Sequence, residues 1–298
     1  MIIPKEIKTY LEEVFKAANN EVSKRLSIMP HTEISALNEL FLSVLKQYAI
    51  LKKFDSNWSI RVDSIFTGAG RHYYSWEIAD IAVFILFRSR GKVFKIKVAL
   101  LQSKKIYPKG LRKENDNNFR FTSLKELIKL EDNFSKILKA KRFNFNESCL
   151  YKGLKVKNAQ WESINNYSKT TKIPVFYMFF NPTKIPLKSK FSENSTISEF
   201  ENEAGIRIIP ESKMYETFKR KNRLPSYKDL KNNINLRETK DPEAGLRLEY
   251  FISEFLLESE EVYNSESIND EELDKLFQKR NGALQSAILI NIETDGSK

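Results

Sequence analysis

Residues 78–105, IADIAVFILFRSRGKVFKIKVALLQSKK, decide the fold of this chain. Two runs rich in β-branched and aromatic residues, 78–88 and 92–105, are separated by the polar residues 89–91 (SRG). Runs of this kind around a short glycine-containing loop predict a β-hairpin. The hairpin is therefore the starting point for predicting the rest of the sheet.

The alternation of side chains predicts how the two strands of the hairpin pair. Successive side chains of a strand point to opposite faces, so Gln102 and Lys104 share one face. If the apolar faces of both strands coincide, a pairing sum near 182 places Ala82 opposite Leu100 and Asp80 opposite Gln102. Three polar side chains then meet at the open end of an apolar face, which marks a candidate functional site.

Two helices and a strand are expected before the hairpin. Apolar residues recur at helical spacing over 5–26 and 32–53, and residues 59–66 alternate as in a strand. On the second helix, Glu33 falls on the apolar stripe and Glu39 falls on the opposite side. We therefore expect Glu33 to point inward against the sheet.

The remaining pattern predicts an α/β fold. A helix is expected at 123–141, and buried strands are expected at 174–180 (PVFYMFF) and 205–209 (GIRII). Helices mixed with hairpin and single strands predict a mixed central β-sheet flanked by helices. We divide the chain into an α/β domain over 1–215 and a helical C-terminal extension over 216–298, packed on the same domain. Within the extension we expect an amphipathic helix at 243–262, a further helix near 270–280 and an apolar run at 287–292.

Composition narrows the classes of function. The 298 residues carry a net charge of +11, which favours polyanionic partners such as nucleic acids. A single cysteine, Cys149, and two histidines, His31 and His72, argue against cysteine-rich or multi-histidine metal centres, so any metal should be bound by oxygen, as Mg²⁺ or Mn²⁺ is. No apolar run is long enough to cross a bilayer and no signal pattern opens the sequence, so we expect a cytoplasmic protein without membrane contact.

The polar cluster suits metal-assisted hydrolysis of a phosphodiester bond. Asp80 and Glu33 would supply carboxylate oxygens to the metal, and the side-chain carbonyl of Gln102 and the main-chain carbonyl of Ser103 would complete the shell. A bound Mg²⁺ lowers the pKa of a water ligand and neutralises charge that develops on the phosphate. Lys104 would orient the water or stabilise that charge.

These residues carry a resemblance to a known family. An acid that opens one strand, Asp80, followed by Gln102-Ser103-Lys104 at the end of the next, resembles the PD-(D/E)XK nuclease superfamily in its QxK variant, as in Mrr-like restriction endonucleases. The resemblance covers about residues 31–105 and implies a restriction-endonuclease-like core with an acid on a preceding helix. Ala79 replaces the usual proline, and Gln102 replaces an acid, so the site has one negative charge fewer.

The resemblance implies a DNA endonuclease acting in restriction or phage defence. Double-stranded DNA is the expected substrate, and cutting both strands implies a homodimer or partner proteins of a defence system. The polar loop 107–120 follows the site directly. The residues expected to contact phosphates are Lys105, Lys109, Arg112 and Lys113.

Other interpretations of the same residues stay open. Asp80 and Lys104 would also suit an ordinary ion pair at a sheet edge, and Gln102 would suit a polar strand end. The fold with a weakened site would serve as a nucleic-acid-binding subunit of a larger complex. A ribonuclease is a third alternative, because nothing in the sequence separates DNA from RNA.

Overall fold

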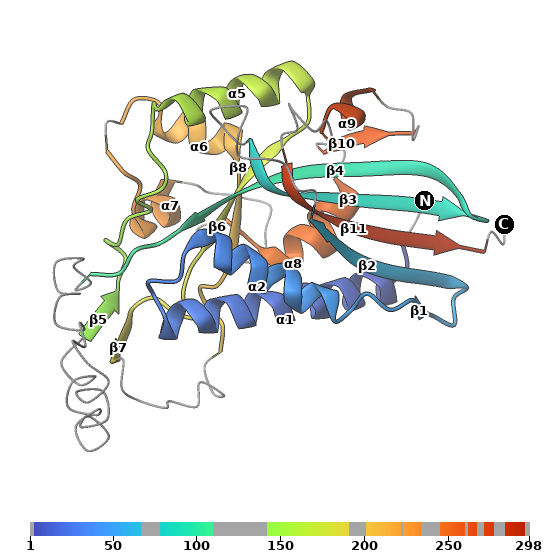
Figure 1. The fold of residues 1–298 in the computed structure, drawn as a ribbon, viewed down its shortest axis with the longest axis horizontal. Helices are drawn as coiled ribbons and strands as arrows, with labels where there is room; N and C mark the ends of the chain where they lie inside the picture. The colour runs from blue at the N-terminus through green and yellow to red at the C-terminus, as the bar shows by residue number, and fades with distance from the viewer. Residues whose placement is uncertain are drawn as a thin grey trace, which may run out of the picture.

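The computed structural model describes residues 3–66, 78–109, 142–190, 201–221, 223–233, 245–259, 262–266, 271–276 and 284–295. Within these ranges the protein has an α/β fold, and its large mixed central sheet is flanked by helices (Figure 1). This architecture confirms the predicted α/β class and the predicted mixed central sheet flanked by helices.

Nine described strands form the central sheet. Their order across the sheet is β1 (Lys52–Lys53), β2 (Trp58–Phe66), β11 (Leu284–Thr294), β3 (Ala79–Ser89), β4 (Lys92–Lys105), β6 (Val175–Phe180), β8 (Arg207–Pro210) and β9 (Leu246–Arg247), and β10 (Tyr263–Ser265) pairs with β4. A separate two-stranded sheet contains β5 (Arg142–Phe145) and β7 (Leu187–Lys190). The sheet is mixed because β11–β3 and β4–β6 are parallel pairs and the other pairs are antiparallel.

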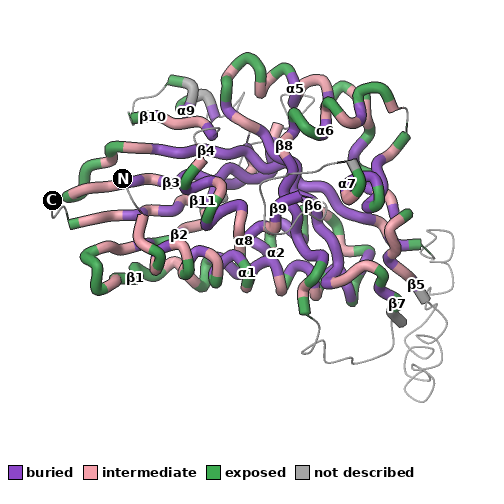
Figure 2. Tube along the Cα trace, turned by 180° about the vertical axis from the view of Figure 1, so that it is seen from behind, coloured by how far each residue is buried: buried purple, intermediate pink, exposed green. Residues whose placement is uncertain are grey.

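Helices cover both faces of the central sheet. The described helices are α1 (Lys5–Ile28), α2 (Ile34–Lys46), α5 (Ala159–Thr171), α6 (Glu211–Phe218), α7 (Tyr227–Asn233), α8 (Leu248–Tyr250), its π-helical continuation η3 (Phe251–Leu256), and α9 (Glu271–Leu276). Helices α1, α2 and α8 lie against one face, and α5 and α6 lie over the other (Figure 1). Burial is greatest in the strands between these two layers (Figure 2). Among the described residues, no helix combines the length and the apolar character needed to cross a bilayer.

The hairpin has the predicted register. Ala82 pairs with Leu100 and Phe84 pairs with Val98, and the strands join through the expected turn, where Gly91 has a φ of 79°. The first seven residues of β3 and all six residues of β6 are buried. These apolar strands form the core because helices on both faces remove their side chains from water.

The second helix is shorter than its sequence pattern predicts. It ends at Lys46 rather than near residue 53, and the next residues form turns and then β1. The main chain of Lys52 and Lys53 pairs with β2, so it is used in the sheet rather than in a helix. Ile50, between the helix and β1, is 75% exposed.

The C-terminal part of the chain contributes strands as well as helices, so the expectation of a helical extension over 216–298 needs correction. The apolar run predicted at 287–292 lies in β11, which pairs with β2 on one side and with β3 on the other. The helix predicted over 243–262 is also shorter, because Leu246 and Arg247 pair with β8 as strand β9. Strand β11 thus completes the centre of the sheet that carries the hairpin.

Several expectations fall on residues outside the described ranges. These are the helix at 123–141, most of the loop at 107–120, and two expected phosphate contacts, Arg112 and Lys113.

Candidate functional site

The hairpin brings Asp80 and Gln102 into direct contact. The amide Nε2 of Gln102 donates a hydrogen bond to Oδ2 of Asp80 at 2.6 Å, and both side chains are buried. The predicted register requires this contact, because it places Asp80 opposite Gln102. The pair lies where β3 begins and β4 nears its end. Gln102 and Lys104, two residues apart on β4, point to the same face of the sheet.

Main-chain groups hold Asp80 in a defined orientation. The backbone N–H of Ser103 donates to the same Oδ2 at 2.6 Å, and the hydroxyl of Ser286 on β11 donates to the Asp80 carbonyl at 2.9 Å. The Gln102 amide and the Ser103 N–H both donate to Oδ2, and together they fix the orientation of the carboxylate. The position of this acid therefore depends on three neighbouring strands.

Helix α2 reaches the site through Asn38 and not through Glu33. The hydroxyl of Ser103 donates to Oδ1 of Asn38 at 2.7 Å on the face of the sheet opposite to Gln102. Glu33 is exposed and forms the N-cap of α2 with an extended backbone, so the expectation of an inward Glu33 is wrong. The helical stripe does not apply to a residue that precedes the helix.

Lys104 lies on the Gln102 face and contacts the start of α5. Its Nζ donates to Oε1 of Gln160 at 3.3 Å, and the side chain is buried. A Cβ placed on Gly153 would lie 3.8 Å from Cδ of Lys104 and 3.9 Å from Cδ1 of Ile34, so the segment before α5 packs closely on the lysine stem. Lys104 thus lies against the start of α5 and the segment that precedes α5.

Lys105 points to the other face and is buried, which does not suit the expected phosphate contact. Its Nζ donates to the carbonyls of Pro30 at 3.1 Å and Thr32 at 2.5 Å, and it lies 4.6 Å from the centre of the Tyr107 ring. Burial lowers the pKa of Lys105, and the nearby Glu33 carboxylate opposes that change. Lys105 therefore fastens the connection between α1 and α2 to the sheet.

The oxygen atoms at this site fit a hard metal ion in part. Gln102 Oε1 is buried and has no hydrogen-bond partner in the described part of the chain, while Nε2 of the same amide contacts the Asp80 carboxylate. Carboxylate and amide oxygens are ligands that Mg²⁺ accepts. Among the described residues, however, no three His, Cys, Asp or Glu side chains gather as a metal-binding group.

Two contacts of the site were not predicted from the sequence. Asn38 shares the buried stripe of α2 with Leu37 and Phe41, and a polar residue in such a stripe is a signal of a specific partner. Gln160 carries no comparable signal, because its role depends on where α5 docks on β4.

A second buried acid lies on α6, which packs against α5. Glu211, the first residue of α6, is 3% exposed, and its Oε1 has no partner among the described residues. Burial raises its pKa to about 7, with Lys169 lowering the pKa and Glu162 raising it. The Trp161 ring on α5 stacks with the rings of Tyr177 and Tyr215, at centroid distances of 5.8 and 6.0 Å.

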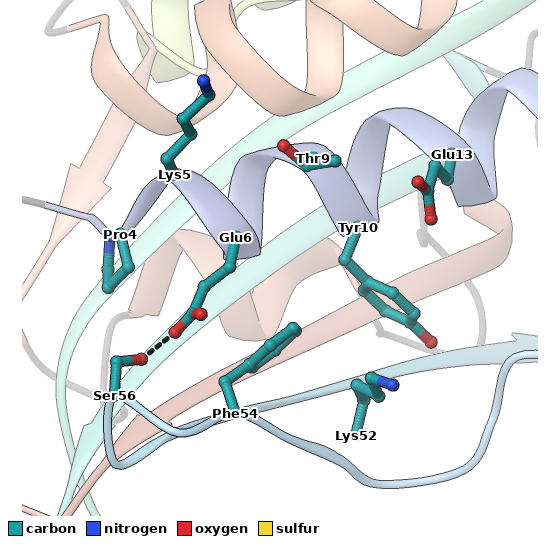
Figure 3. A pocket seen from close by; sticks show the side chains of 9 residues that line it. All are labelled: Pro4, Lys5, Glu6, Thr9, Tyr10, Glu13, Lys52, Phe54 and Ser56. Carbon is teal, nitrogen blue, oxygen red and sulfur yellow. Dashed lines mark hydrogen bonds between the residues drawn. The ribbon is translucent and has the colours of Figure 1, made fainter.

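A groove of about 800 Å³ lies elsewhere, between the start of α1 and the β1–β2 hairpin. Figure 3 shows its lining, in which the Ser56 hydroxyl donates to the Glu6 carboxylate and the rings of Tyr10 and Phe54 lie close to one another. None of its lining residues belongs to the Asp80 site.

Comparison of the chain with protein-family models, with curated proteins and with solved structures finds no match.

Proposed function

We propose that this protein is a metal-dependent nuclease that hydrolyses phosphodiester bonds of DNA, with a restriction-endonuclease-like core. One observation carries the proposal: the buried Asp80 carboxylate contacts the Gln102 amide at 2.6 Å, and the Gln102 carbonyl oxygen lacks a partner among the described residues. A buried acceptor without a partner is costly, and a cation is one group that would satisfy it.

In this proposal, the residues of the site have different roles in catalysis. Asp80, Gln102 and the Ser103 carbonyl would hold Mg²⁺ or Mn²⁺, and the ion would supply an activated water and neutralise charge on the phosphate. The Ser103 N–H orients the carboxylate. Lys104, two residues along the same face, would place a positive charge beside the phosphate.

One observation favours a second candidate, a nuclease-like module that binds nucleic acid without cutting it. The described residues supply a single acid at the site, because Gln102 stands where an acid is usual and Glu33 faces solvent. A site with one carboxylate binds a divalent ion less tightly than a site with two or three.

A cytoplasmic homodimer, or an assembly with defence-system partners, belongs to the same proposal. A single metal site cuts one strand, so two sites are needed for a double-strand break. The defence setting rests on analogy with the superfamily alone.

The decisive experiment compares cleavage of plasmid DNA and of RNA in Mg²⁺, Mn²⁺ or EDTA. We expect metal-dependent cleavage that falls about 100-fold or more in Asp80→Asn and in Lys104→Met. Asp63→Asn, another acid on the sheet, and Lys92→Met, at the other end of β4, serve as controls and should cleave normally.

A second measurement separates ligand binding from folding. Mg²⁺ should raise the melting temperature of the wild-type protein and of the controls, but not that of Asp80→Asn. Cleavage that survives both site substitutions would refute the proposed site. DNA binding without cleavage in any metal would favour the module, and cleavage of RNA alone would identify a ribonuclease.

A further inference from the structure

The segment 151–158 (YKGLKVKN) lies beside the candidate site and carries three lysines and no acid. Two contacts place it beside Lys104. Gly153 packs on the lysine stem, and Gln160, just past the segment, accepts a hydrogen bond from the Lys104 ammonium at 3.3 Å. The segment therefore borders the place where a scissile phosphate would bind.

This segment is firmly attached to the fold. Tyr151 is buried, its backbone N–H donates to the Pro225 carbonyl at 3.0 Å, and its hydroxyl donates to Asn181 at 2.7 Å. Leu154 is also buried, and its backbone N–H donates to the Tyr151 carbonyl. At the far end, Asn158 caps α5 by accepting a hydrogen bond from the backbone of Trp161 at 2.8 Å.

The three lysines face outward from this anchored segment. Lys152, Lys155 and Lys157 are exposed, and none of them forms an ion pair within the described part of the chain. Lys152 lies 5.2 Å from the centre of the Tyr107 ring, beyond the end of β4. Lys157 holds a left-handed backbone with a φ of 62°, an uncommon conformation for a residue with a side chain.

We propose that Lys152, Lys155 and Lys157 form a phosphate-binding ridge that holds the sugar–phosphate backbone of a nucleic-acid strand against the Asp80 site. The inference rests on the proposed function for the identity of the partner. Its physical basis is separate: a fixed backbone presents three cations that have no acidic partner among the described residues, and their binding to phosphates releases counterions from the strand. Because the contacts are to phosphates, the ridge is expected to bind without reading sequence.

The test measures binding in EDTA, where no cleavage occurs. Fluorescence anisotropy with a labelled 30-base-pair duplex gives the affinity at several salt concentrations, and labelled single-stranded DNA and RNA form parallel arms. Each lost phosphate contact lowers the slope of log K against log salt by about 0.9 on duplex DNA. For the triple variant Lys152→Ala, Lys155→Ala and Lys157→Ala, we expect the slope to fall by about 2 to 3 and the affinity at 0.1 M salt to fall roughly 30- to 500-fold.

A matched triple variant controls for net charge. The variant Lys52→Ala, Lys53→Ala and Lys92→Ala removes three exposed lysines, two on β1 and one at the start of β4. This control variant should bind nucleic acid nearly as tightly as the wild type does. Replacing the three ridge lysines with arginine should retain binding. All variants should keep the wild-type melting temperature, because the lysines are exposed.

The outcomes separate the ridge from the nuclease. Equal losses in the ridge and control triples, or no binding of any of the three nucleic acids by the wild type, would overturn the ridge. Selective loss in the ridge triple would support it, even if the wild type cuts nothing. In that case the proposed nuclease activity alone would fail, and the arm with the larger loss would identify the strand.

Discussion

The buried carboxyl of Glu211 makes stability depend on pH in a defined direction. Its ordinary pKa is 4.5, and burial raises the pKa to about 7 in the folded protein. The folded state thus binds this proton more tightly than the unfolded state does. The stability it contributes is complete below about pH 4.5 and is lost as the pH rises through about 7.

The size of the effect follows from the two pKa values of Glu211. A tenfold difference in proton affinity corresponds to about 1.4 kcal/mol, so ionising Glu211 in the folded state costs about 3 kcal/mol. Little of this cost is screened, because only 3% of the residue is exposed. The substitution Glu211→Gln keeps the shape and removes the charge. The variant should therefore exceed the wild type in stability by about 2 to 3 kcal/mol more at pH 8 than at pH 5.

Urea unfolding at several values between pH 5 and pH 8, followed by far-UV circular dichroism, measures this difference. The control is Glu216→Gln, an exposed glutamate on the same helix, which should change stability little at any pH. A stability gain from Glu211→Gln that is the same at pH 5 and pH 8 would show that the carboxyl is not held protonated by burial, and the reasoning would fail.

Two further predictions concern the stability of the sheet and of its contacts with η3. Gly245→Ala should destabilise the protein by about 2–4 kcal/mol, because φ is 100° and the new Cβ would lie 2.5 Å from Ile209 Cγ1. The control Gly91→Ala should cost about 1 kcal/mol in the same urea titration, because φ is 79° but no atom lies within 4 Å of the new Cβ. Lys97→Met should cost about 2–4 kcal/mol, because the buried ammonium donates to two main-chain carbonyls just beyond η3, at 2.7 and 2.9 Å, and thermal melting that shows no loss would contradict this role.

The hairpin was predictable because the residues that determine its pairing lie close together in the sequence. Alternating apolar residues and a short glycine turn leave one register that buries the shared face, and that register sets Asp80 beside Gln102. The same local periodicity predicted α1 and the buried strand β6. The periodicity did not predict the residue at which α2 begins. One residue outside the helix, Glu33 no longer follows the stripe and turns to solvent.

Contacts between distant parts of the chain needed the tertiary structure. The run at 287–292 reads as apolar, but nothing in it specifies that β11 lies between β2 and β3, because sheet order depends on how all the layers pack. The same reason applies to the hydrogen bond between Gln160 and Lys104 and to the position of segment 151–158 beside Lys104, because both depend on how α5 docks on β4. By itself, then, the sequence determined the fold class and the Asp80–Gln102 pair, since adjacent strands encode their own pairing. Only the tertiary structure decided which other side chains surround that pair, since those contacts join segments separated by many tens of residues and depend on the packing of whole helices.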